Sequence, residues 1–478
     1  MVSTRAGRGE IIMKHQKEKS SLKEIRKKIY SMILPITIES ILQMTAGLVS
    51  MAMIGRIAAE SSSAVNAIGL SQRITQIVWA LFKGITTGAS VFVAQAYGAK
   101  NFKKLKSVTQ QTILSSLILV IVFQQIIFWY APKLLTIFNP SETLLQNGSL
   151  YLKTISWGLP FMVIMLAVAA VLQGMGNART PMLIAFMMNL INIVLSFILI
   201  FGHLGFPALG IKGAAIATAS AQFCGAMIGL YVLFSKNGVL SSLLNREFFK
   251  FDIRQVVDVY KVGLPTSLES IFWQIAAIIL TKSILTFGET PFAAHQLGLQ
   301  AESISYMPAA GFGIAATTFI GQALGAKNSE LGKAYLKETL KGTIWVTIFC
   351  ASLLIFIPQV IMGMLTPNKE LIALGSKYLV IMGLVQIPQN ISGVLNGALR
   401  GAGYTRVPMF VAAAGLWGIR VPLTLLLTYK FHLSIIAIWI VMGADLIVRF
   451  ILSFVIYKSK NIYNKELVFT ETNADISL

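Results

Sequence analysis

Cysteine and histidine are scarce in this chain of 478 residues, which holds two cysteines and four histidines. Cys224 and Cys350 both fall inside long apolar stretches, so the sequence contains neither a disulfide framework nor a zinc-ligand spacing. It also lacks a His-Glu-x-x-His sequence and a Gly-Lys-Ser/Thr phosphate loop. We therefore predict that the protein is not an enzyme, that it needs no cofactor, and that ATP is not its energy source.

Charged residues are equally sparse. They make up 12% of the chain, compared with about 25% in an ordinary soluble domain, while 55% of residues are hydrophobic and the mean hydropathy is +0.72. Only helices and closed barrels can span lipid, and the apolar stretches here are long and show no strand-like alternation. The composition predicts an all-α integral membrane protein.

Twelve stretches are long enough for a membrane helix, which needs about 20 residues. They cover approximately 30–55, 64–97, 108–131, 150–172, 180–202, 209–235, 259–287, 291–325, 342–365, 375–399, 407–429 and 434–457. This division predicts five parts in chain order: a basic tail over 1–29, an N-lobe of helices 1 to 6 over 30–235, a linker over 236–258, a C-lobe of helices 7 to 12 over 259–458, and a tail over 459–478.

The chain carries 40 lysines and arginines against 19 acidic residues, a net charge of +21. These basic residues form no groove or aromatic-interleaved helix for nucleic acid, and they gather between the spans on one side. The positive-inside rule then places both termini in the cytoplasm of a multi-pass protein of the plasma or inner membrane. Residues 1–29 have no apolar core of the kind found in a secretory signal.

Three phrases occur twice. Leu34–Ile41 matches Leu264–Ile271 at an offset of 230 residues; Gln95–Asn101 matches Gln322–Asn328, and Leu172–Met182 matches Leu399–Met409, both at an offset of 227. The chain is therefore two copies of a six-helix unit, and because six is even the copies have the same orientation. Parallel repeats are typical of transporters with a central cavity and a site near the membrane midplane.

Glu39 and Glu269 occupy the same position in the two copies, inside apolar spans. An acid at this depth costs about 2.5–3.5 kcal/mol and usually marks a transport pathway. We expect Lys83 to neutralise Glu39, which leaves Glu269 freer to exchange protons or to bind sodium or a cationic compound. The structural alternative is a neutral acid that is hydrogen-bonded within the bundle.

Other polar residues within the spans have two interpretations. Asp445 and Arg449 are one helical turn apart and Arg420 lies at similar depth, so these three residues are predicted to form structural ion pairs. The remaining candidates line the cavity or join helices; they are His295, Glu302, Asn189 and Gln386.

Together the repeated phrases, Ala293–Gln296 and the stretch from Trp439 to Arg449 resemble the multidrug and toxic compound extrusion (MATE) family, from about residue 30 to 458. The resemblance implies twelve helices in two lobes that export amphipathic, often cationic compounds in exchange for protons or sodium ions. It departs from the family at Ser50 and Ser196, where many members have aspartates of an amino-terminal proton site. That proton site is therefore not transferred to this chain.

We expect a monomeric antiporter in the lipid bilayer whose partners are small organic cations and whose coupling ion is a proton or sodium. The alternative within transport is a flippase for a lipid-linked saccharide, which would favour a groove rich in lysine and arginine for phosphates. A membrane receptor or enzyme is the alternative from another class.

Overall fold

The computed structural model describes residues 3–54, 61–138, 140–236, 238–241 and 246–469, which contain helices and no strand. The α-helices of the first half are α1 (Ser3–Ile54), α2 (Ser61–Gly98), α3 (Phe102–Leu135), α4 (Glu142–Ser156), α5 (Leu159–Gly174), α6 (Arg179–Phe201) and α7 (Gly210–Phe234). Those of the second half are α8 (Ile253–Leu285), α9 (Glu289–Gly325), α10 (Ser329–Phe356), α11 (Pro358–Leu365), α12 (Lys369–Gly401), α13 (Arg406–Gly415), α14 (Val421–Tyr429) and α15 (Ile435–Ser459). Short 3₁₀ or π turns complete the described part: η1 (Thr136–Phe138), η2 (Arg246–Phe249), η3 (Leu416–Arg420) and η4 (Ile462–Asn464).

Within the described residues, ten helical segments are long and apolar enough to cross a membrane, or eleven if α4 and α5, bent by 50°, form one span. This confirms an all-helical multi-pass membrane protein. Residues 30–54 of the first expected span lie in α1, which is not among the ten, and residue 55 lies outside the described residues. The count of twelve therefore stays a prediction.

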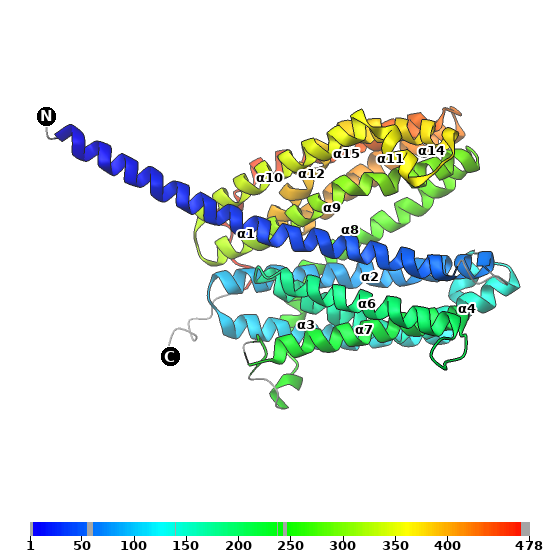
Figure 1. The fold of residues 1–478 in the computed structure, drawn as a ribbon. Coiled ribbons are helices and arrows are strands. Elements are labelled where there is room, and N and C mark those ends of the chain that lie inside the picture. Colours follow the sequence, from blue (N-terminus) through cyan, green and yellow to red (C-terminus); the bar gives the residue numbers. More distant parts are fainter. Residues whose placement is uncertain (1–2, 55–60, 139, 237, 242–245, 470–478) are drawn as a thin grey trace.

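The helices form two groups, α1 to α7 and α8 to α15, here called the N-lobe and the C-lobe (Figure 1). α8 begins at Ile253, within the predicted linker and six residues before the expected span, and residues 237 and 242–245 of that linker lie outside the described residues. The start of α1 and the end of the described chain lie on the same side, here called the terminal face, and the lobes spread apart away from it (Figure 1). α2 contacts α8 and α9, and α1 contacts α9, so the lobes meet along these helices.

Glycines allow α2 and α8 to touch backbone to backbone. A Cβ atom added at Gly88 would lie 2.5 Å from the amide nitrogen of Gly263, and one at Gly84 would lie 2.2 Å from that of Ser267. Small residues allow this close approach between membrane helices, where dispersion contacts and not the hydrophobic effect hold helices together.

The repeated loop phrases meet one another across the two lobes. Gln95 at the end of α2 donates from Nε2 to the carbonyl oxygen of Gly401 (3.0 Å), and Gln322 at the end of α9 donates to that of Gly174 (2.9 Å). The two bonds are related by the sequence offset of 227 residues. The glutamines therefore form a symmetric clasp near the terminal face, which we call the glutamine clasp.

The chain after α15 folds back over the same face. Ile462 belongs to a buried apolar cluster with residues of α1, α9, α10 and α12, whereas Phe469 belongs to one that includes residues of α2, α3 and α5. Between them, the backbone amide of Val468 donates to Oε1 of Gln95 (2.8 Å). Residues 460–469 thus contact both lobes beside the glutamine clasp.

Candidate transport site

A cavity of about 400 Å³ lies between the lobes and is called the central cavity. α2 and α5 line it from the N-lobe, and α8, α9 and α12 line it from the C-lobe. Three charged side chains face it: Lys83, Glu269 and Arg400. Its aromatic wall consists of Trp273 and Tyr306.

Glu269 is held in an ion pair with Arg400. Nη2 of Arg400 lies 2.7 Å from Oε1 and 2.6 Å from Oε2 of Glu269, and the side chains of Arg400 and Glu269 are only 20% and 15% exposed. Arg400 occupies the last turn of α12, and helical side chains point back toward the amino end of their helix. Its guanidinium therefore reaches from the end of α12 back toward Glu269.

A second cavity, of about 200 Å³, lies within the N-lobe and is called the inner N-lobe cavity. Glu39 and Lys83 are its charged lining residues, beside Trp79, Met162 and Met165. The sequence led us to expect an ion pair between Glu39 and Lys83 and a free Glu269. In the described part of the chain the ion pair is found at Glu269 instead.

Neutral amides surround Glu39. Gln43 donates from Nε2 to Oε1 of Glu39 (3.3 Å) within α1, and Gln173 at the end of α5 donates to Oε2 (3.4 Å). Both distances are long for hydrogen bonds. Lys83 faces the same cavity from α2 but forms no ion pair with Glu39 among the described residues.

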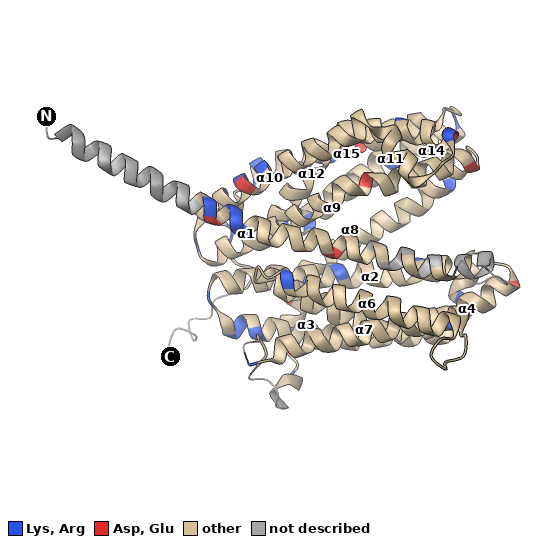
Figure 2. Cartoon of the chain, in the orientation of Figure 1, with Lys and Arg blue, Asp and Glu red and all other residues tan. Residues whose placement is uncertain are grey.

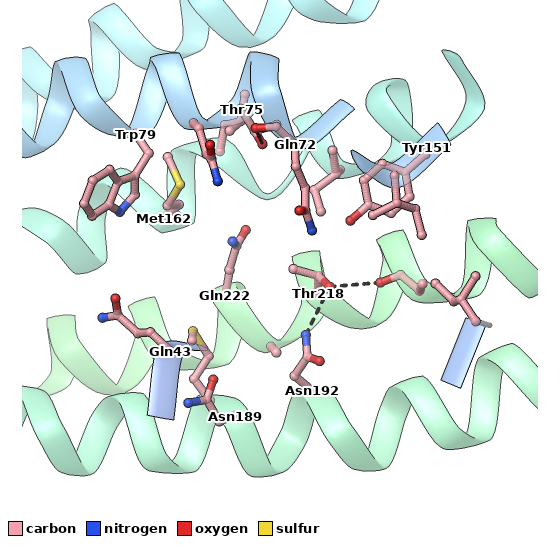
Figure 3. A pocket seen from close by; sticks show the side chains of 18 residues that line it. Gln43, Gln72, Thr75, Trp79, Tyr151, Met162, Asn189, Asn192, Thr218 and Gln222 are labelled. Atoms are coloured by element: carbon pink, nitrogen blue, oxygen red, sulfur yellow. Dashed lines mark hydrogen bonds between the residues drawn. The ribbon is translucent and has the colours of Figure 1, made fainter. Parts of the chain in front are cut away.

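A third cavity, of about 390 Å³, adjoins the second and is called the outer N-lobe cavity (Figure 3). The two N-lobe cavities share Gln43, Trp79, Met162, Met188 and Gln222. The described lining residues of the outer cavity are uncharged; its polar ones carry amides or hydroxyls, as Gln72, Thr75, Asn189 and Thr218 do (Figure 3). Neither amide atom of Asn189 has a hydrogen-bond partner in the protein, which leaves both for a guest molecule or water.

Three candidates from the sequence form a buried network in the C-lobe and line none of these cavities. Glu302 accepts hydrogen bonds from the hydroxyl of Tyr378 (2.6 Å) and from Nε2 of Gln386 (2.9 Å). Nearby, Nδ1 of His295 accepts one from the indole of Trp439 (3.2 Å). This arrangement supports the helix-joining interpretation of Glu302, Gln386 and His295.

The predicted C-lobe ion pairs come together around one buried carboxylate. Nε of Arg420 lies 2.7 Å from Asp445, and Arg449 donates from Nε (2.8 Å) and Nη2 to the same carboxylate. Both guanidinium groups lie against the ring of Trp273, with centroid distances of 5.1 and 4.6 Å. Trp273 also lines the central cavity, so this cluster supports one cavity wall.

Arg420 sits at a helix irregularity. The π turn η3 ends at Arg420, and Pro422 follows at the second position of α14. Proline has no N–H for the carbonyl four residues earlier, here that of Gly418, so the regular helix is interrupted. The wider turn lies where Arg420 reaches Asp445.

Gln173 and Arg400 are the site residues that we did not select from the sequence. The signal that identifies both was the repeat itself, since Gln173 and Arg400 share one repeat position just as Glu39 and Glu269 do.

Two lobes of membrane helices built from parallel repeats, with polar side chains directed into cavities within and between them, define a membrane transporter. The chain belongs to the MatE family, whose family model matches residues 35–198 and 265–426, one segment in each lobe. Members of this family are transporters, and the protein is not an enzyme.

Curated relatives match almost the whole chain. A probable multidrug resistance protein NorM from Thermotoga maritima is 29% identical over 460 residues, covering 96% of this chain and 97% of the relative. A probable multidrug resistance protein YoeA from Bacillus subtilis is 25% identical and covers 92% and 95%. These relatives indicate multidrug efflux as the broad function.

Solved structures share the fold at lower identity. A multidrug resistance MATE family transporter of the MOP superfamily in an outward-facing conformation aligns with a TM-score of 0.83 at 20% identity, covering 92% of this chain and 97% of that one. A MOP superfamily transporter from Pyrococcus furiosus aligns with a TM-score of 0.82 at 20% identity, covering 91% and 95%.

Proposed function

We propose that this protein is a cation-coupled antiporter that exports amphipathic, mostly cationic compounds, acting as a monomer in the plasma or inner membrane. The observation that carries the proposal is the Glu39 carboxylate, which lines a cavity together with Trp79 and methionines. Flexible methionines adapt to different shapes, and an aromatic face attracts a cation. A drug cation fits such a site without a dedicated pocket for each compound.

Exchange follows from competition for a carboxylate. A proton or sodium ion that reaches the midplane acid removes the negative charge that holds the organic cation. The two ligands then exclude each other, and a ligand shifts an equilibrium only through such a difference in affinity. The coupling ion enters from outside and the compound leaves by the same route.

Alternating access is supported by the contacts at the terminal face. Lysines and arginines gather there, on α1, on α10 and at the start of α3 (Figure 2), so we assign this face and both termini to the cytoplasm. The glutamine clasp and residues 460–469 join the lobes at this face. We infer that the lobes rock apart here when the protein opens inward.

The test is transport of a fluorescent organic cation by the purified protein in liposomes, under an imposed pH gradient and, separately, an imposed sodium gradient. We expect one of the gradients to drive the cation against its own concentration. If neither gradient moves the compound, the antiporter proposal fails.

The flippase alternative receives less support from the cavity. Phosphates would need several free cations, and of the two that line the central cavity Arg400 is already paired with Glu269.

A further inference from the structure

The two lobes build the same small site twice. The glutamate of the repeated Leu-Pro phrase is Glu39 in the N-lobe and Glu269 in the C-lobe, and the residue before the first glycine of the repeated loop phrase is Gln173 or Arg400. In each lobe this residue donates a hydrogen bond to the glutamate of its own lobe. The repeat has kept the geometry and changed the donor from an amide to a guanidinium.

The change of donor has a direct electrostatic consequence. A guanidinium stays charged at any physiological pH, and its charge-assisted bonds are about twice as strong as neutral ones. Arg400 contacts both carboxylate oxygens of Glu269, and both side chains are largely buried. A cation that arrives at Glu269 must therefore displace the Arg400 guanidinium, which is part of the chain and cannot diffuse away. Lys83 and Tyr306 are the other titratable groups that line this cavity among the described residues.

Glu39 has no such fixed partner. Its two amide donors carry no charge and lie at 3.3 and 3.4 Å. Among the described residues that line the inner N-lobe cavity, Lys83 on α2 is the only other titratable group, and the repeat places a neutral residue, Ala310, at its C-lobe position. A proton or small cation can therefore reach the Glu39 carboxylate without breaking an ion pair.

We propose that the residue before the first glycine of the loop phrase decides which carboxylate exchanges the coupling cation. Gln173 leaves the Glu39 carboxylate able to bind and release the coupling cation, whereas Arg400 holds Glu269 in a permanent ion pair. Gln173 and Arg400 are thus positioning residues that restrict coupling to the N-lobe. This inference rests on the proposed antiport, but its test does not require transport.

The experiment is infrared difference spectroscopy of the purified protein when pH is lowered or sodium is added, which detects a carboxyl group as it takes up a proton or a cation. We expect Glu39→Gln to remove the carboxyl signal and Glu269→Gln to retain it. In the double variant Gln173→Arg with Arg400→Gln, the dependence should reverse, so that Glu269→Gln now removes the signal. A signal that depends on Glu269 in the otherwise unaltered protein would overturn the proposal.

A conservative variant separates charge from packing. Arg400→Lys keeps the positive charge, so Glu269 should still give no infrared carboxyl signal. Arg400→Gln removes the charge, so Glu269 should then give one. If Lys and Gln at this position give the same spectrum, Arg400 acts by packing alone and the proposal is wrong.

Transport distinguishes this inference from the proposed function. With coupled antiport, Gln173→Arg should reduce gradient-driven transport by about tenfold or more, the scale of one charge-assisted ion pair, and the double swap should restore much of it. Exchange of labelled for unlabelled compound without an ion gradient reports whether the substrate path is intact in each variant. Normal infrared responses without any transport would reject the antiporter and leave the division between Glu39 and Glu269 standing.

Discussion

Asp445 is a fully buried carboxylate that two arginines share, Arg420 and Arg449. Removing its charge by Asp445→Asn leaves both guanidinium groups buried without a counter-ion. Breaking a buried ion pair in this way costs about 3–5 kcal/mol. We expect a marked fall in the midpoint of thermal unfolding in detergent.

The matched control is Glu330→Gln at the start of α10. Glu330 pairs with Lys333, but both side chains are largely exposed, so the loss should stay below about 1 kcal/mol. Equal losses from the two substitutions would show that Asp445 does not support the C-lobe.

For single residues, the sequence predicts which charged side chains are unfavourable inside an apolar span, but it does not predict which of them pair with one another. Charges inside apolar stretches singled out Glu39, Glu269, Asp445 and the two arginines beside it. Arg400 was missed because its position at a helix end resembles an interface residue, while its long side chain reaches inward. A hydrophobicity pattern records where a Cα atom lies and says little about the reach of its side chain.

Helices α2, α5, α9 and α12 meet at the glutamine clasp. Gln95→Ala with Gln322→Ala removes both clasp bonds and the bond from Val468 to Gln95. At about 1 kcal/mol per bond, the equilibrium should shift toward separated lobes by about 3 kcal/mol, or roughly 150-fold. Spin labels at exposed positions Arg179 and Lys337, one in each lobe, would report the shift as a longer distance population. The native cysteines, Cys224 and Cys350, are replaced by serine for this measurement.

Gln125→Ala provides the control for the clasp. This glutamine lies on α3 and bonds to Trp129 of the same helix, so its loss should leave the distances unchanged. An unchanged distance distribution in the double clasp variant would mean that the glutamines do not hold the terminal face closed.

Among the elements, the long helices were predictable and their interruptions were not. Apolar length predicts α3, α6, α7 and α15, because a membrane helix must cover the hydrocarbon. The 50° bend between α4 and α5, the break before α11 and the π turn at Arg420 depend on local packing and on prolines. Periodicity averages over such single-residue events.

The whole molecule has an unequal distribution of charge that predicts its orientation. A single cysteine at exposed Glu142, the first residue of α4, should react with a membrane-impermeant maleimide in intact cells, because α4 lies at the end of the molecule away from the termini (Figure 1). A cysteine at exposed Glu330, at the terminal face, should react only after the membrane is permeabilised. The cysteine-free protein, with Cys224 and Cys350 replaced, sets the background, and the reverse labelling pattern would place the termini outside.

The repeat predicts two lobes, because three matched phrases require two copies of one unit. It does not predict that the lobes meet at the terminal face and spread at the other. The same sequence forms an arrangement that is closed at the terminal face and one that is closed at the opposite face. The two states of a transporter differ in free energy by only a few kcal/mol. Which face is closed depends on contacts between the two lobes, such as the glutamine clasp and the close approach of Gly88 to Gly263.

Residues 460–469, which bridge both lobes, follow α15 in the chain and therefore leave the ribosome after it. When they emerge, every helix before them has been synthesised, and their docking sites on α1, α2, α9 and α10 come from both halves of the chain. The terminal face can therefore close only after both lobes have been made, and a chain that stops after α15 would possess the membrane helices described above yet lack the segment that joins its halves.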